Sequence, residues 1–183
     1  MSLSSQEASA SLQQVEEASR RSSQLYFYHC SSPHLIMWGI IWIIGYGGTG
    51  LFPGYGLPLW LALVAIGTVG GIVLGRRYRR YGTSGPYAWR MGALWAIILF
   101  FVFATYAILP PHSGRQLCAY PALITGCAYM AIGLWRGLRY VASGVVVAAL
   151  TLIGYYFIEP IFFWFAAVGG GAMILTGLWF RTA

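Results

Sequence analysis

The sequence contains no lysine and little charge of either sign. Charged residues make up 8% of its 183 residues, whereas a soluble globular domain carries about 25%. Hydrophobic residues make up 58%, and the mean hydropathy is +0.67. This composition excludes a soluble fold and predicts an all-α, polytopic membrane protein.

Recognisable catalytic motifs are also missing. The sequence contains no P-loop, no GxSxG nucleophile motif, no nucleotide fingerprint and no pair of carboxylates within an apolar segment. Glu159 is the only acidic residue after position 17, so the apolar segments are almost free of the ionisable groups that membrane enzymes and ion-coupled transporters use. Three cysteines give no disulfide framework. We therefore predict a protein that is not an enzyme and that binds no cofactor or metal.

Hydropathy divides the chain into a polar tail and six apolar segments. The tail covers residues 1–33 and the transmembrane domain covers 34–183. Each segment has about 18 to 22 residues, enough at ~1.5 Å per residue to cross a ~30 Å hydrocarbon core. The prediction is a six-transmembrane-helix bundle, with a gap around Gly137 that leaves room only for a tight turn. Its segments lie at 35–52, 58–75, 88–109, 117–135, 140–158 and 161–180.

All eleven basic residues are arginine, and their positions indicate membrane topology rather than nucleic-acid binding. If the segments alternate across the membrane, ten of the eleven fall on one side and Arg115 falls on the other. Arginine-rich loops stay in the cytoplasm during insertion. We therefore expect both termini in the cytoplasm, with the protein in a bacterial inner membrane. We expect no cleavable signal peptide, because the tail lacks an apolar stretch.

The polar tail has features of a helix. Ser4 to Glu7 offers a capping box, and Glu16–Arg20 and Glu17–Arg21 are spaced as favourable pairs four residues apart. Leu12 and Val15 belong to a thin apolar edge, too narrow for a core. Two interpretations follow: a helix that lies near the membrane or on a partner, or a solvated and partly frayed extension. The narrowness of the edge favours the second.

The chain also shows an internal repeat of helical hairpins. In three copies, a glycine near the start of one segment is followed by a proline, and the next segment ends in glycine and arginine, most alike at 133–136 and 177–181. This order resembles the HdeD-type acid-resistance membrane proteins. The resemblance implies six helices built as three repeated hairpins and a stress-related role in the membrane, without a known catalytic site.

Small residues four positions apart predict close helix contacts. Such spacing presents one flat face, so that two helices approach closely in lipid. The contacts lie either inside the bundle, which is the more common case, or in a homo-oligomer interface. The residues concerned are Gly67, Gly71 and Gly75, with Gly133, Gly137, Ala167 and Gly171.

A basic cluster follows the second segment. Arg76, Arg77, Arg79 and Arg80 are four arginines in five positions. Topology control by the positive-inside rule explains them most simply. Alternatively, each contributes ~1 kcal/mol of attraction to an anionic membrane surface, or the cluster contacts a protein partner.

Polar and aromatic residues offer weaker candidate sites. Glu159, next to Pro160, is best explained as a helix cap, although it could join His112 and Arg115 in a polar cluster. His29, Cys30 and His34 lack the spacing of a metal site. Deep aromatic residues pack in the core by default, but a ligand pocket could be lined by Trp42, Trp95, Tyr106, Tyr155 and Glu159.

These features predict a non-enzymatic integral membrane protein that acts as an interaction, regulatory or stress-related module through its cytoplasmic face. Membrane lipid, a protein partner and a second copy of the chain are the expected contacts. The alternative is a small-molecule transporter or a membrane substrate-binding component.

Overall fold

The computed structural model describes residues 5–79 and 87–182, and every regular element within these ranges is helical. The all-α prediction is confirmed. The elements are α1 (Ser5–Leu51), η1 (Pro53–Tyr55), α2 (Gly56–Arg79), α3 (Tyr87–Ile108), α4 (Gly114–Arg136), α5 (Leu138–Phe157), α6 (Ile161–Trp164), the π-helical η2 (Phe165–Gly170) and α7 (Gly171–Arg181).

Several of these helices are suited to cross a membrane. Within the described residues, five helices are long and apolar enough, one of which consists of α6, η2 and α7 together. Within α3, the residues Gly92–Ile108 form a shorter apolar helix. These helices support a multi-pass membrane protein. The number six stays a prediction. The five candidate spans are Ser11–Leu51, Pro53–Arg77, Gly114–Arg136, Leu138–Phe157 and Ile161–Arg181.

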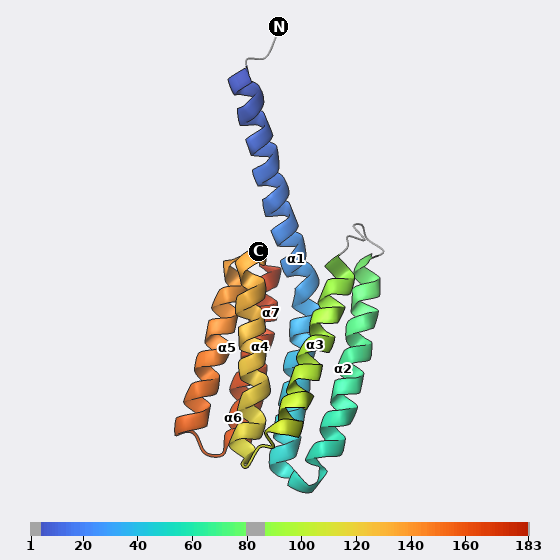
Figure 1. Ribbon diagram of the computed structural model, residues 1–183, viewed down its shortest axis with the longest axis vertical. Coiled ribbons are helices and arrows are strands. Elements are labelled where there is room, and N and C mark those ends of the chain that lie inside the picture. Colours follow the sequence, from blue (N-terminus) through green and yellow to red (C-terminus); the bar gives the residue numbers. More distant parts are fainter. Residues whose placement is uncertain (1–4, 80–86, 183) are drawn as a thin grey trace.

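Helix α1 is continuous through the predicted boundary at residue 33. It has 47 residues and includes Pro33, so it is about 70 Å long at 1.5 Å per residue, more than twice a ~30 Å hydrocarbon core. Figure 1 shows its N-terminal part projecting beyond the rest of the bundle. Residues 11–23 are exposed. We call residues 5–23 the projecting segment.

The ion pairs expected within the projecting segment do not form. Among the described residues, Arg115–Glu159 is the only ion pair, so Glu16 and Glu17 do not reach Arg20 and Arg21. Exposed pairs of this kind gain only a few tenths of a kcal/mol, about what side-chain entropy and competing water remove. Residues 5–23 are helical in the structure without them.

The closest helix pairs are α4 with α5 and α1 with α7. Helix α1 therefore occupies the middle of the bundle, with α4 and α5 on one side and α2 and α3 on the other (Figure 1). Both of the closest pairs cross the limits of the predicted hairpins, which would have joined α1 to α2 and α3 to α4. The triplicated hairpin stays a prediction.

Glycines allow α1 and the last span to approach closely. A Cβ at Gly170 would lie 2.7 Å from the carbonyl oxygen of Gly39, and a Cβ at Gly177 would lie 2.9 Å from that of Ser32. Both distances are shorter than real Cβ contacts, so the backbones touch where any side chain would separate them. Such contact gives dispersion attraction in lipid, which supplies no hydrophobic force between helices.

A buried aromatic chain fills the middle of the bundle. The ring of Tyr46 lies 5.5 Å from Trp42, 4.8 Å from Trp60 and 5.4 Å from Phe165. Its hydroxyl donates a 3.2 Å hydrogen bond to the carbonyl oxygen of Cys118. The four rings therefore connect α1, α2 and the last span, and the hydroxyl adds α4.

The predicted tight turn at Gly137 is confirmed. Gly137 is the single residue between α4 and α5, and its φ of 123° lies in a region that L side chains rarely adopt. Its N–H donates a 2.9 Å bond to the carbonyl oxygen of Gly133. The turn places the ends of α4 and α5 beside α1 at the base of the projecting segment.

Candidate functional site

Arginines gather at the end of the bundle from which α1 projects. Helices α2, α4 and α7 all end there, at Arg79, Arg136 and Arg181, and α5 begins there (Figure 1). We call this the arginine end. Arg115 lies at the opposite end, on the first turn of α4. Of the predicted basic cluster, Arg76 and Arg77 are exposed at this end, Arg79 closes α2, and Arg80 lies outside the described residues.

Arg139 connects the start of α5 to the end of α7 and to α1. Its Nη1 donates a 2.8 Å hydrogen bond to the carbonyl oxygen of Trp179. Its guanidinium carbon lies 4.9 Å from the centre of the Trp179 ring and 5.7 Å from that of Tyr28. A cation beside the last carbonyls of α7 also complements the helix dipole. Arg139 is thus held by polar and aromatic contacts at once.

A cluster of aromatic residues lies beside Arg139. Tyr28, Tyr140 and Phe180 are buried, with ring centres 4.7–5.8 Å apart. The guanidinium of Arg136 lies 4.4 Å from the centre of the Phe27 ring. We call these five residues with Arg139 the aromatic collar. The collar packs against α1 at the point where the helix leaves the bundle, so it fixes the direction of the projecting segment.

Arg181 adds a further contact on α1. Its Nε donates a 3.0 Å hydrogen bond to the hydroxyl of Ser32, which is fully buried. The sequence interpretation missed this serine and the collar. The available signal was the run Tyr26-Phe27-Tyr28, because three aromatic residues at the end of a polar tail need a surface to pack against.

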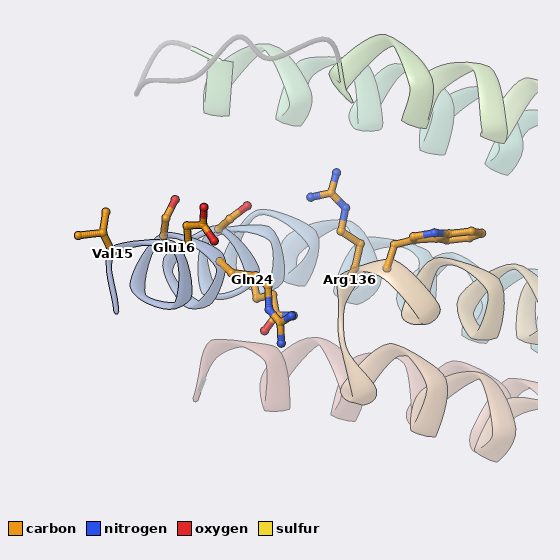
Figure 2. Close-up of a pocket in the computed structure, with 8 residues that line it drawn as sticks. Val15, Glu16, Gln24 and Arg136 are labelled. Carbon is orange, nitrogen blue, oxygen red and sulfur yellow. The ribbon is translucent and has the colours of Figure 1, made fainter. Parts of the chain in front are cut away.

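A groove of about 480 Å³ runs beside the projecting segment and ends at α4. Figure 2 shows that its residues come from two elements, with Val15, Glu16 and Gln24 on α1 and Arg136 at the end of α4. Most of the residues that line it are polar, and they carry charges of both signs. Its members include Val15, Glu16, Arg20, Gln24, Trp135 and Arg136.

The predicted glycine stripe on α2 faces α1 over part of its length. A Cβ at Gly67 would lie 2.7 Å from the Trp38 ring, so these helices are in contact there. The carbonyl oxygen of Gly71 lies 3.2 Å from Nε2 of His34. Gly75 has nothing within 4 Å of an added Cβ. Two of the three glycines therefore serve contacts inside the bundle.

Of the remaining small residues of the prediction, some also contact another helix and some do not. Gly133 faces Val141 and Tyr140 of α5, and Gly137 forms the turn. Ala167 is exposed, and Gly171 has nothing within 4 Å of an added Cβ. The close contacts at Gly170 and Gly177 were missed. Their spacing of seven residues, shared by Gly126 with Gly133, was the available signal, since two helical turns return to one face.

The aromatic residues predicted to line a pocket lie in separate contacts. Trp42 packs edge-on against Tyr46, whereas Trp95 packs on Trp38 with ring centres 4.6 Å apart. The hydroxyl of Tyr106 donates a 2.8 Å bond to the carbonyl oxygen of Leu117. The cavity beside Trp42 holds about 10 Å³, the lower limit for one water molecule. The structure does not bring these residues together around a common space.

Glu159 pairs with Arg115 at the end opposite the arginine end. Nη1 of Arg115 also donates a 2.7 Å hydrogen bond to the carbonyl oxygen of Tyr155. Helix α6 begins after Pro160 without a side-chain cap, so Glu159 joins α4 to the end of α5 rather than capping a helix. The backbone N–H of His112 bonds to Gln116 instead.

The histidines and cysteine near the arginine end have other neighbours. Nδ1 of His34 lies 3.3 Å from the carbonyl oxygen of Cys30, and its Nε2 lies near Gly71. Across the described ranges, no three His, Cys, Asp or Glu side chains are grouped as metal ligands. His34 therefore connects α1 with α2.

Comparison with protein-family models, curated proteins and solved structures finds no match to this chain. The function proposed below accordingly rests on the residues and their arrangement.

Proposed function

We propose that this chain is a non-enzymatic integral membrane protein whose projecting segment docks a protein partner. In this proposal α3 is the sixth crossing, since its 22 residues are enough to span the hydrocarbon core. The arginine end lies in the cytoplasm, in keeping with arginine retention during insertion into a bacterial inner membrane. The role is interaction or regulation, with the stress-related role that the HdeD-type resemblance implies.

The observation that carries the proposal is a long exposed helix on a fixed base. An isolated helix of about 20 residues is only marginally stable in water. The projecting segment contributes no burial of its own over residues 11–23, yet the aromatic collar holds its base between α5 and α7. An exposed helix that is anchored at its base is suited to present a surface to another protein.

The face offered to the partner is small and amphipathic. Leu12 and Val15 are both 66% exposed and lie three positions apart, so they share one side of the helix. Glu16 and Glu17 precede Arg20 and Arg21 along the projecting segment. We expect the partner to hold the two apolar side chains in a groove. We also expect it to carry basic groups opposite the two glutamates and acidic groups opposite the two arginines, which lie nearer the membrane.

Site-specific photo-crosslinking tests this function. A photoreactive amino acid replaces Leu12 in the full chain, expressed in its own membrane at its natural level. We expect one protein adduct of defined mass. The matched control replaces Phe157, which is 79% exposed at the end of α5 opposite the arginine end, and should give no such adduct. Equal labelling from both positions, or no protein adduct from Leu12, would contradict the proposal.

A further inference from the structure

We propose that the groove beside the projecting segment binds the headgroup of one anionic phospholipid, between Arg20 of α1 and Arg136 of α4. This inference goes beyond the proposed function and does not depend on it, because the ligand is a membrane component and the contact needs no protein partner.

The position of the groove matches the depth of lipid headgroups. Its floor is the end of α4, where Trp135 is 78% exposed and is the last residue before Arg136. Exposed tryptophan side chains favour the boundary between hydrocarbon and water. The α1 side of the groove continues away from the bundle along the projecting segment (Figure 2). A lipid beside α4 would therefore place its phosphate within the groove.

Two exposed apolar side chains lie close in sequence to Trp135, at the α4 end of the groove. Leu134 and Leu138 are 75% and 79% exposed and flank the α4–α5 turn next to Trp135. Together with the indole they offer an apolar surface for an acyl chain. A free anion would gain nothing from these residues, whereas a phospholipid uses both the polar groove and the apolar corner.

The charge of the groove fits a single negative charge. Arg20 and Arg136 bring two positive charges, and Glu16 brings one negative charge, so the net value is +1. A phosphodiester carries one negative charge, and the planar guanidinium is the side chain best matched to phosphate oxygens. Arg136 is oriented by its contact with the Phe27 ring, and Arg20 forms no ion pair in the described part of the chain.

The other polar residues favour a headgroup with hydroxyl groups. Ser19, Ser23 and Gln24 line the groove with groups that both donate and accept hydrogen bonds. The Glu16 carboxylate accepts from a hydroxyl and repels a second phosphate. The groove therefore fits phosphatidylglycerol chemistry better than a headgroup that carries several phosphates.

Native mass spectrometry of the purified full chain, exchanged into nanodiscs of phosphatidylcholine with phosphatidylglycerol, tests the inference. We expect one retained phosphatidylglycerol and about tenfold weaker retention in Arg20→Gln, as for a lost charged hydrogen bond. Arg20 is exposed and holds no buried contact, so this variant should fold. Arg77→Gln removes the same charge from the same end and is the matched control, with retention unchanged.

Two outcomes would overturn the inference. Equal weakening by Arg20→Gln and Arg77→Gln would show general attraction to surface charge rather than a site. Displacement of the lipid by glycerol phosphate at the same concentration would show that the acyl chain contributes nothing. Neither result bears on the Leu12 crosslink, so the protein-docking proposal succeeds or fails separately.

Discussion

Gly170 and Gly171 are adjacent in sequence but face different surroundings. A Cβ at Gly170 meets the backbone of α1, whereas one at Gly171 meets nothing within 4 Å. We expect Gly170→Ala to lower the stability of the bundle by about 1–3 kcal/mol, the usual effect of overpacking. Gly171→Ala should leave it unchanged or slightly raised. Thermal unfolding in detergent measures both variants, and equal midpoints would contradict the close packing of Gly170 against α1.

Gly137 permits a second comparison at the residue scale. Its φ of 123° is strained for any side chain, at a cost of about 1–3 kcal/mol, and a Cβ there would also collide with Tyr28. Gly137→Ala should therefore lower the unfolding midpoint. Gly54→Ala, where an added Cβ meets nothing within 4 Å, is the control. If the Gly137→Ala midpoint equalled that of Gly54→Ala, the result would contradict the positive φ described for Gly137.

At the scale of elements, the continuity of α1 determines how far the projecting segment extends from the bundle. Ser11 and Leu51 are both exposed and 40 positions apart, so an unbroken helix separates them by about 60 Å. Spin labels at these positions, with the three cysteines replaced by alanine, should give one narrow distance near this value in pulsed electron spin resonance. A broad distribution at shorter distances would show a frayed tail.

The sequence predicts helices here better than it predicts their ends and partners. Hydropathy finds the segments because lipid requires long apolar runs. It placed a boundary at residue 33, since polar composition changes there, although α1 continues from the polar into the apolar part of the chain through Pro33. Small residues four apart were found at Gly67. The seven-residue spacing of Gly170 and Gly177 indicates a contact face, but it does not identify α1 as the helix that lies opposite.

At the scale of the whole molecule, the two ends of the bundle differ in charge. The arginine end carries Arg76, Arg77 and Arg181, and the other end carries the Arg115–Glu159 pair. If the arginine end lies in the cytoplasm, as proposed, a cysteine at His112 should react with a membrane-impermeant maleimide in intact cells. A cysteine at Ser11 should react only after lysis. The reverse pattern would overturn the proposed orientation.

Only part of the candidate site could be predicted from the sequence. The arginines and the thin edge of Leu12 and Val15 could be read directly. The groove could not, because it combines Arg20 with Arg136, which are far apart in sequence and line one groove only because α1 packs against the α4–α5 turn.

The most direct test of the account is native mass spectrometry of the protein extracted gently from its own membrane without overexpression. We expect a stoichiometric protein partner, lost in the Leu12→Glu, Val15→Glu variant and retained in Arg115→Gln at the opposite end. A complex that survives the double substitution would contradict docking on the projecting segment. A bound small molecule other than a phospholipid, with no protein partner, would instead support the transporter or substrate-binding alternative.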